Sequence, residues 1–264
     1  MTTKVIITGG AGFIGSNLAE ALLAKGWEVH IVDNLSAGKR ENIPEGAIFH
    51  EVDVLDTNAL RDIFNEAKYV FHLAANPRVQ NSIDNPIETN EINVGGTLSV
   101  LTAAKEAGAR KVVFSSSASV YGNQEEVPLK EKGIMEPMSP YGLHKYIGEH
   151  KCRLWSSLYN LPTVSLRYFN VYGPKLDPHG AYPLVIGHFL KLRRLNKPLS
   201  ITGDGTNTRD YIHVRDVVRA NIMAAESDHG LGNVFNIGTG IETSVNTIAK
   251  LIGGDIEYVQ PRVE

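Results

Sequence analysis

Short apolar runs alternate with segments of helical period through the first two-thirds of the chain. Ile14, Leu18 and Leu22 recur every four residues ahead of Gly26, which is typical of a helix that ends at a glycine. Strands that are apolar on both faces and separated by helices predict a parallel sheet covered on both sides, a doubly wound α/β fold. The six runs expected to be strands are residues 5–8, 28–32, 47–52, 69–73, 112–114 and 163–167.

The last hundred residues are less regular. Loops rich in glycine and proline, 173–183 and 202–207, interrupt short elements, although a helix over 214–226 and a strand over 233–237 are still predicted. We therefore expect two domains. The first consists of 1–170, to which 211–237 returns later in the chain. The smaller second domain consists of 171–210 and 238–264.

Composition limits the kind of protein. The chain has 264 residues, of which 42% are hydrophobic and 21% charged, as in ordinary globular proteins. A net charge of −3 gives no general attraction to nucleic acid or to an anionic membrane. The single cysteine, Cys152, excludes an intrachain disulfide and a zinc site built on several thiolates. No stretch resembles a membrane span or a signal peptide, so we expect a cytoplasmic protein.

A glycine-rich loop follows the first predicted strand. In the sequence TGGAGFIG, Gly9, Gly12 and Gly15 are spaced three apart, and Phe13 and Ile14 open the next helix. Such glycines permit a tight turn and close approach of the backbone to a pyrophosphate, to which the helix N-terminus offers free N–H groups. The pattern indicates a dinucleotide-binding Rossmann fold; a tight turn with a purely structural role is the alternative.

A carboxylate at the end of the second predicted strand favours one cofactor. Asp33 lies 18 residues after Gly15, where it can accept both ribose hydroxyls of adenosine and repel a 2′-phosphate, so NAD is preferred to NADP. Two alternatives stay open at this point. Asp33 could cap only the following loop, and Lys39 and Arg40 could hold a 2′-phosphate.

Polar residues that could take part in catalysis follow the fifth predicted strand. Three serines, Ser115 to Ser117, come directly after Phe114. Ser139 and Pro140 predict the start of a helix, on which Tyr141 and Lys145 are four apart and share one face. Both groups are expected at the carboxyl edge of a parallel sheet, where ligands bind.

These motifs resemble, in order and spacing, the extended short-chain dehydrogenase/reductase superfamily, and within it the NAD-dependent epimerase/dehydratase family. The segments VDNLSAGKREN, RYFNVYGP and GDGTNTRDYIHVRDV strengthen a resemblance that covers essentially the whole chain and is greatest to the UDP-glucose 4-epimerases. The resemblance implies that Ser117, Tyr141 and Lys145 form a catalytic triad. It implies that Tyr141 removes the proton of the sugar 4-hydroxyl, held also by Ser117, while NAD takes the C4 hydride and later returns it to the other face.

The physical chemistry of the triad agrees with these roles. A tyrosine hydroxyl with its ordinary pKa of about 10 is a poor base at neutral pH. We expect the Lys145 ammonium and the positive nicotinamide to lower the pKa of Tyr141.

The resemblance also implies contacts to the cofactor. Asp53 could instead cap the next helix, and Ser115 and Ser116 could only satisfy backbone groups at the end of a strand. The residues implied to contact NAD are Gly9, Gly12, Phe13, Ile14, Gly15, Asp33, Asn34, Ser36, Asp53, Val54, Leu73, Ala74, Ala75, Asn93, Ser115, Tyr141, Lys145 and Tyr168.

Contacts to a UDP-sugar substrate are implied for Ser82, Ser117, Tyr141, Asn170 and Arg209. The guanidinium of Arg209 is expected to pair with the diphosphate; a surface salt bridge to a neighbour such as Asp210 is the alternative. His72 and His213 lie in apolar runs and are interpreted as core residues, because the histidines show no pair at metal-ligand spacing, and no metal is expected.

Two positions in the active-site segment bear on the reaction. The resembling 4,6-dehydratases have Asp-Glu before Val-Tyr-Gly, and the related decarboxylases keep the Glu, whereas this chain has Ala118 and Ser119. Oxidation and reduction at C4 alone are therefore expected, which is epimerisation of UDP-glucose and UDP-galactose. The alternatives are 4-epimerisation of UDP-GlcNAc or UDP-glucuronate, and a non-catalytic dinucleotide-binding regulatory protein.

The resemblance carries two further expectations. Family members usually form homodimers through a four-helix bundle, here from helices near 87–107 and 140–160. They also usually continue for several dozen residues past the point where this chain ends, so the substrate domain is expected to be incomplete.

Overall fold

The computed structural model describes residues 2–176 and 185–260. The chain divides into two compact units. The first comprises Met1–Tyr168 and Arg215–Ile237, and the second comprises Phe169–Val214 and Gly238–Glu264. Their assignment to cofactor and substrate remains a prediction.

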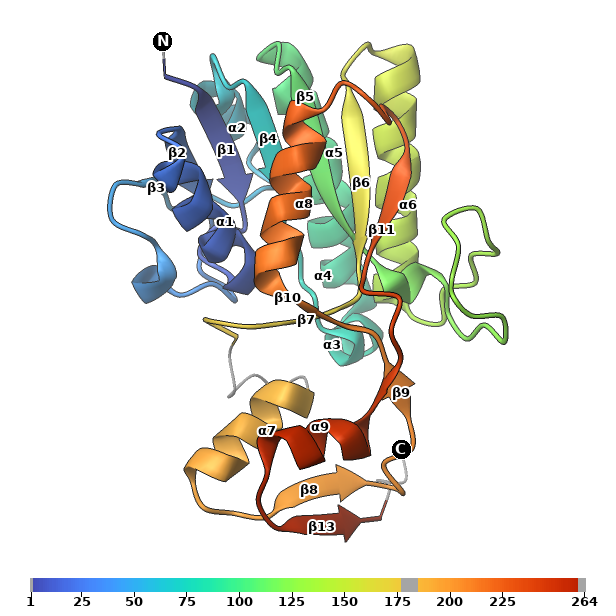
Figure 1. Ribbon diagram of the computed structural model, residues 1–264. Coiled ribbons are helices and arrows are strands. Elements are labelled where there is room, and N and C mark those ends of the chain that lie inside the picture. Colours follow the sequence, from blue (N-terminus) through green and yellow to red (C-terminus); the bar gives the residue numbers. More distant parts are fainter. Residues whose placement is uncertain (1, 177–184, 261–264) are drawn as a thin grey trace. The chain divides into compact units, whose positions relative to one another are not determined.

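A seven-stranded parallel sheet forms the centre of the first unit (Figure 1). Its strand order, β11-β6-β5-β4-β1-β2-β3, shows that the chain starts in the middle and winds outward in both directions. This is the doubly wound order, so the predicted fold class is confirmed. The strands are β1 (Lys4–Thr8), β2 (Glu28–Val32), β3 (Ile48–His50), β4 (Tyr69–His72), β5 (Lys111–Ser117), β6 (Thr163–Tyr168) and β11 (Val234–Ile237).

Strand β5 is longer than its apolar run. Its pairing with β6 continues as far as Ser117 opposite Tyr168, so the three serines belong to the strand rather than to the loop after it. All seven strands point their carboxyl ends to the same edge. The ends of β1, β4 and β5 therefore lie side by side there, which brings together segments far apart in the sequence.

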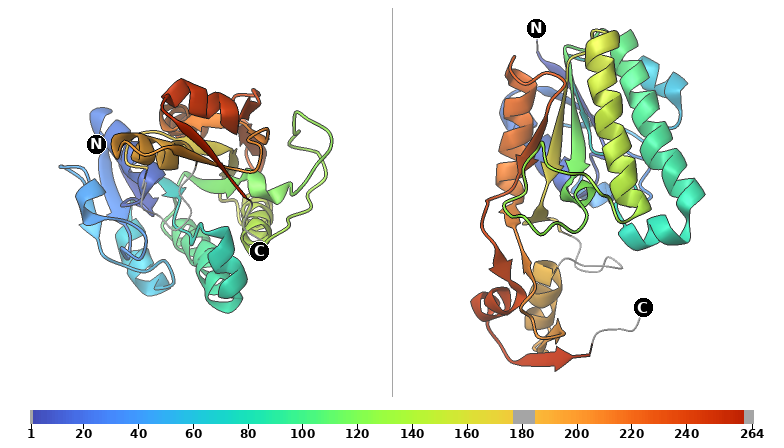
Figure 2. Two further views of the ribbon diagram at one scale, coloured as in Figure 1. Left: turned by 90° about the horizontal axis from the view of Figure 1, so that it is seen from below. Right: turned by 90° about the vertical axis from the view of Figure 1, so that its right-hand side faces the viewer.

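Helices cover both faces of this sheet. Helices α1 and α8 share one face, where Lys25 forms an ion pair of 3.1 Å with Glu226. Helices α2, α5 and α6 cover the other, and the right-hand view of Figure 2 shows α5 and α6 opposite α8. The bounds are α1 (Phe13–Ala24), α2 (Thr57–Phe64), α5 (Gly96–Glu106), α6 (Pro140–Leu158) and α8 (Val214–Glu226).

Shorter segments complete the first unit. Helices α3 (Val79–Asp84) and α4 (Pro86–Asn90) precede a π-helical turn, Glu91–Gly95, that leads into α5. Single 3₁₀ turns cover Arg40–Asn42 and Ala118–Val120.

The second unit has its own small core. Phe189, Leu199, Ile201, Ile248 and Ala249 are buried together. Its strand pairs are β10 with β7 and β13 with β8, both parallel, and β12 with β9, antiparallel. The elements are β7 (Asn170–Tyr172), α7 (Val185–Arg194), β8 (Leu199–Thr202), β9 (Thr208–Arg209), β10 (Tyr211–His213), β12 (Thr243–Ser244), α9 (Val245–Ile252) and β13 (Ile256–Val259).

Candidate active site

The glycine loop joins the ends of β1 and β4. Gly9 has a φ of +73°, and a Cβ there would stand 2.7 Å from the backbone nitrogen of Ala74. A Cβ at Gly15 would stand 2.2 Å from the carbonyl oxygen of Gly9, so the first turn of α1 packs directly on the loop. Gly12 precedes α1 without any side-chain cap, which leaves the N–H groups of the first turn to a ligand. These features fit the pyrophosphate of a dinucleotide.

Asp33 braces this loop from the end of β2. Its Oδ2 accepts a hydrogen bond of 3.0 Å from the N–H of Ala11, and its Oδ1 accepts one of 2.8 Å from Leu35. A Cβ at Gly38 would come within 2.8 Å of the carboxylate, so this glycine also leaves room beside it. Burial raises the pKa of Asp33, and the two backbone hydrogen bonds act in the opposite direction. The carboxylate therefore caps the following turn and orders the glycine loop as well.

A second acidic residue lies beside the same turn. The side-chain amide of Asn34 donates to Asp53 at 2.8 Å, and the Asn34 oxygen accepts from the N–H of Ser36 at 3.0 Å. The alternative that Asp53 caps the next helix is wrong, because Asp56 is the N-cap of α2 and accepts from Ala59. Four residues predicted to contact the adenosine are thus gathered at the ends of β2 and β3: Asp33, Asn34, Ser36 and Asp53.

The remaining predicted cofactor residues of the first unit flank the loop after β4. Leu73 N–H donates to the carbonyl of Thr8 at 3.0 Å, and Ala74 N–H donates to the Thr8 hydroxyl at 3.3 Å. Asn93 supports this loop, since its Oδ1 accepts from Asn76 N–H at 2.7 Å. Val54 is buried against Gly96, and Ala75 is half-buried. Their contacts to NAD remain predictions.

Ser117, Tyr141 and Lys145 converge at the carboxyl end of β5. Ser139 caps α6 through its hydroxyl, which fixes the first turn on which Tyr141 lies. The Ser117 hydroxyl is close enough to Tyr141 to act on the pKa of its phenol, and Lys145 Nζ lies 5.9 Å from the centroid of the Tyr141 ring. The structure thus brings the three residues together at this edge of the sheet, and their catalytic roles remain a prediction.

Two glycines allow α6 to approach β5 this closely. A Cβ at Gly148 would stand 2.4 Å from the ring of Phe114, and one at Gly142 would stand 2.6 Å from the carbonyl oxygen of Ser119. Larger side chains at either position would push Tyr141 and Lys145 away from the end of the strand.

Burial dominates the electrostatics of this pair. It raises the pKa of Tyr141 to about 12, while the nearby Ser117 hydroxyl acts to lower it. It lowers the pKa of Lys145 to about 8, with Glu149 acting to raise it. Burial therefore keeps the pKa of Tyr141 above its ordinary value in the chain without ligands, and the lowering expected from Lys145 together with the nicotinamide remains a prediction.

Each of the three serines has a defined partner. The carbonyl of Ser115 accepts a hydrogen bond of 2.7 Å from Lys145 Nζ, and the Ser117 hydroxyl donates to that of Ser119 at 3.0 Å. The hydroxyl of Ser116 donates to the carboxylate of Glu149 at 2.5 Å. Its interpretation as a group that satisfies only the backbone is therefore wrong, since its partner is a buried charge.

Ser82 and Tyr168 have partners within the protein. Ser82 lies in helix α3, is fully buried, donates to the carbonyl of Val79 and accepts from the backbone N–H of Tyr141 at 3.1 Å. The hydroxyl of Tyr168 donates to Asn221 at 2.9 Å, and burial raises its pKa. Ser82 thus holds Tyr141 in place, and the substrate contact predicted for it remains a prediction.

In the second unit, Asn170 lies on β7, which pairs with β10, and Arg209 lies on β9, which pairs with β12. The amide of Asn170 donates to the carbonyl of Asp210 at 2.9 Å. Among the described residues Arg209 makes no salt bridge to Asp210, because its guanidinium donates to the Thr208 carbonyl and the Asp210 carboxylate accepts from Thr239 and Gly240. The alternative for Arg209 is therefore wrong, and its pairing with a diphosphate remains a prediction.

The two singled-out histidines differ. His72 is buried between the hydroxyls of Thr8 and Thr97, at 2.7 and 3.0 Å, as expected for a satisfied core residue. Its pKa falls to about 3 because burial disfavours the charged ring. His213 is only half-buried and meets Tyr172 edge to face. Within residues 2–176 and 185–260, no three His, Cys, Asp or Glu side chains form a metal-binding group.

Glu149 and Arg167 are polar residues near this site that the sequence patterns do not single out. Glu149 is one turn beyond Lys145 on α6, and Arg167 is a charged residue inside the buried strand β6. Both residues could have been identified from the sequence. A carboxylate that repeats the spacing of Tyr141 and Lys145 shares their face, and a buried arginine needs a partner.

Residues 5–238 match the model of the NAD-dependent epimerase/dehydratase family. The chain belongs to this family. Membership confirms NAD as the cofactor that the glycine loop and Asp33 predict. No helix in the described part of the chain is long and apolar enough to cross a membrane.

Relatives agree over nearly the whole chain. A UDP-glucose 4-epimerase of Mycolicibacterium smegmatis is 39% identical, and the match covers 98% of this chain and 87% of that protein. The crystal structure of the Thermotoga maritima UDP-glucose 4-epimerase with UDP-glucose superposes with a TM-score of 0.93 and 39% identity over 99% of this chain and 87% of that one. A UDP-N-acetylglucosamine 4-epimerase from Methanobrevibacter ruminantium gives 0.92 and 36% over 100% and 87%.

Other members of the family carry other activities. The Bacillus cereus UDP-glucuronic acid 4-epimerase, solved with UDP-glucuronic acid and NAD, has a TM-score of 0.87 at 31% identity over 98% of this chain and 86% of that one. A UDP-N-acetyl-α-D-glucosaminuronate decarboxylase of Bacillus cytotoxicus is 36% identical over 95% of this chain and 79% of that protein. The family as matched here is thus one of UDP-sugar enzymes.

Proposed function

We propose that this chain catalyses the NAD-dependent 4-epimerisation of a UDP-hexose. The reaction interconverts UDP-glucose and UDP-galactose through a transient 4-keto sugar. One observation carries the proposal: Tyr141 and Lys145 share one face of α6 at the end of β5, where Lys145 Nζ lies 5.9 Å from the centroid of the Tyr141 ring and is held by the carbonyl of Ser115. The names of the relatives at 39% identity support the choice of sugar.

The chain's own residues perform the proton chemistry. Tyr141 would accept the proton of the sugar 4-hydroxyl and return one after the ketose has turned, while Ser117 holds the same oxygen by a hydrogen bond. NAD, when bound, supplies the hydride acceptor and a positive nicotinamide ring. That positive charge would lower the pKa of Tyr141, because it favours the phenolate, and so would oppose burial, which raises the pKa to about 12.

The residues after β5 support epimerisation over elimination or decarboxylation. Ala118 and Ser119 form a short 3₁₀ turn, and the Ser119 hydroxyl accepts a hydrogen bond of 3.0 Å from Ser117. Neither side chain can protonate or deprotonate C5 or C6 of a sugar. Within the proposal, Arg209 pairs with the diphosphate, and Ser82 and Asn170 belong to the substrate contacts.

A panel of UDP-sugars tests the choice of substrate. The purified chain would be incubated separately with UDP-galactose, UDP-GlcNAc and UDP-glucuronate, and each product followed by proton NMR. Conversion of UDP-galactose to UDP-glucose at the greatest kcat/KM is expected. Conversion confined to UDP-glucuronate or UDP-GlcNAc would show that this sugar, and not UDP-galactose, is the substrate. If none of the three is converted, even with NAD added, the non-catalytic alternative is favoured.

We also propose that the chain forms a homodimer through the helical segments near 87–107, which run from α4 to α5, and near 140–160, in α6. Apolar side chains stand exposed along this side of the first unit, and 77% of Ile87 and 67% of Leu158 is accessible. A four-helix bundle would cover them. The others are Leu98, Leu143 and Leu154. A dimeric mass by light scattering is expected, and a monomer at micromolar concentration would contradict it.

A further inference from the structure

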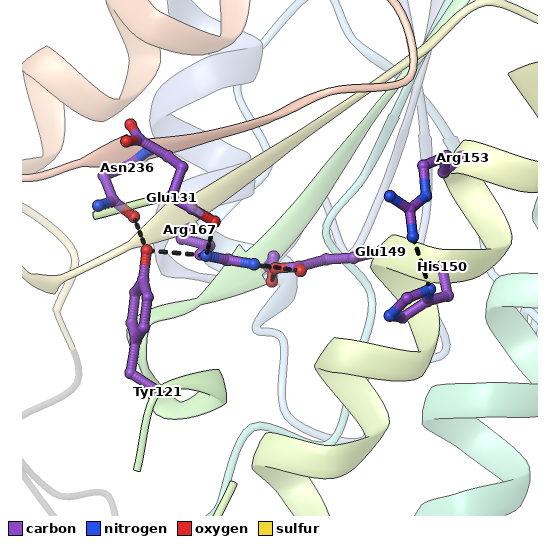
Figure 3. A network of polar contacts seen from close by, with 8 residues as sticks. Tyr121, Glu131, Glu149, His150, Arg153, Arg167 and Asn236 are labelled. Atoms are coloured by element: carbon purple, nitrogen blue, oxygen red, sulfur yellow. Dashed lines mark hydrogen bonds and ion pairs between the residues drawn. The ribbon is translucent and has the colours of Figure 1, made fainter. Parts of the chain in front are cut away.

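A buried ion pair lies directly behind the candidate catalytic residues. Only 3% of the Arg167 side chain and 4% of the Glu149 side chain are accessible, and the guanidinium meets the carboxylate through two bonds of 2.7 Å (Figure 3). Such a pair is a weak source of stability, because desolvation of both charges offsets their attraction and well-packed apolar replacements are often as stable. A role for this ion pair is therefore more readily found in the residues to which it is hydrogen-bonded.

The Glu149 carboxylate holds the end of strand β5. The same oxygen that accepts from Arg167 accepts a hydrogen bond of 2.5 Å from the Ser116 hydroxyl. Ser116 lies between Ser115, whose carbonyl binds Lys145, and Ser117, the serine predicted to act with Tyr141. One carboxylate thus anchors the residue between these two serines of the strand.

The two anchors come from consecutive turns of one helix. Lys145 and Glu149 are four apart on α6 and point to the same side, so Lys145 binds Ser115 and Glu149 binds Ser116. A helix tied at a single point can slide or rotate on a strand. Two directional bonds, one turn apart, fix its register on β5 and with it the place of Tyr141.

Arg167 extends the same network to the segment that follows Ser117. Its Nη1 donates to the Tyr121 hydroxyl at 2.8 Å and to the Glu131 carbonyl at 3.1 Å. Tyr121 in turn donates to Asn236 at 2.6 Å, and the N–H of Asn236 donates to the Glu131 side chain at 3.0 Å. Figure 3 shows Arg167 between Tyr121 and Glu149. The chain on both sides of Ser117 is therefore held by one guanidinium–carboxylate pair.

We propose that Glu149 and Arg167 are positioning residues for the reaction, which set the register of α6 on β5 through Ser116 and so hold Ser117, Tyr141 and Lys145 in their reactive arrangement. This inference rests on the proposed 4-epimerase function. A displacement of about 1 Å at reacting groups lowers rates by about 10²-fold, so loss of the register has a large expected effect.

The test separates positioning from stability. Ser116→Ala removes the anchor and leaves the ion pair intact, and the double variant E149L/R167M replaces the pair by apolar side chains. We expect each to lower kcat for UDP-galactose at least ~10-fold, with KM changed less than about twofold and the urea midpoint of the double variant close to that of the wild type.

Lys111→Met is the matched control. Lys111 is a buried charge on the same strand, at the opposite end, where its Nζ donates to the carbonyls of Ala224 and Ala225 at 3.1 and 3.2 Å. It should lower the urea midpoint and leave kcat of the folded fraction unchanged. Losses of kcat that follow the urea midpoint across all three variants, or full kcat in Ser116→Ala, would overturn the proposal.

A second readout does not depend on the sugar. The side-chain resonances of Lys145, followed by NMR of ¹³C-labelled lysine and assigned by their loss in Lys145→Met, should move in Ser116→Ala and E149L/R167M and stay in place in Lys111→Met. If the wild type converts no UDP-sugar while these shifts appear, the proposed function fails and the positioning role stands. Unmoved resonances in both variants would reject the positioning role.

Discussion

Lys145 Nζ donates a hydrogen bond of 2.7 Å to the carbonyl oxygen of Ser115. This bond ties the residue one helical turn after Tyr141 to the strand that carries Ser117, so it joins the helix and the strand of the candidate site. The lysine is 4% exposed and keeps a charge beside an aromatic ring, 5.1 Å from the centroid of Phe114. Its charge state is therefore coupled to both folding and reactivity.

The first prediction concerns the pH dependence of stability at Lys145. Its pKa is about 8 in the folded chain and about 10.5 when unfolded, so between these values the unfolded state binds more protons. The penalty for burying the charge, up to about 3 kcal/mol below pH 8, fades as the pH rises to 10.5. We expect the wild type to gain stability from pH 8 to 10 relative to Lys145→Met, as measured by urea unfolding. Parallel curves would contradict the buried, charged lysine.

The second prediction tests the glycine loop with a matched pair. An alanine at Gly15 would place its Cβ 2.2 Å from one backbone oxygen and 2.8 Å from the Cα of Gly10. Gly15→Ala should lose about 2–3 kcal/mol of unfolding free energy and weaken NAD binding. Gly95→Ala meets nothing closer than 3.5 Å in a helical segment, so it should be neutral or gain up to about 1 kcal/mol. Equal changes in unfolding free energy for the two substitutions would show that the glycine loop can shift to accommodate a Cβ at Gly15.

The third prediction concerns acid stability at His72. The folded pKa of about 3 lies below the unfolded value of 6.5, so the stabilisation by the neutral ring is complete above pH 6.5 and is lost as the pH falls towards 3. Relative to His72→Gln, the wild type should lose about 2 kcal/mol between pH 6.5 and 5.

Urea unfolding at several pH values measures this difference. The exposed His229→Gln is the control and should retain the wild-type slope. A His72→Gln variant with the same acid dependence as the wild type would show that His72 titrates in the folded protein.

Much of the fold follows from local pattern. The helix predicted over 214–226 and the strand over 233–237 match α8 and β11 to within one residue, because apolar periodicity and glycine ends are local signals. The site's main residues also follow from motif and spacing. The Ser116–Glu149–Arg167 contacts do not, because they join a strand, a helix and a second strand whose packing no short segment specifies.

The same distinction explains why one alternative fails and why one pKa does not follow from the sequence. The sequence allows Asp53 as a cap of the next helix, but in the structure Asp56 caps α2. Spacing places Lys145 one turn from Tyr141, whereas the loss of water around the phenol, which raises its pKa, depends on packing between segments far apart in the sequence. Burial at this level is a tertiary property.

The most direct test of the account is the conversion of UDP-galactose to UDP-glucose by the wild type and by Tyr141→Phe, with NAD saturating and proton NMR as the detector. The account predicts steady conversion by the wild type and a kcat lower by about 10³-fold in the variant, because a general acid–base group of this kind contributes 10²–10⁴-fold. NAD affinity, measured by calorimetry, should be unchanged. Comparable conversion by both proteins would contradict the role of Tyr141 and with it the proposed mechanism.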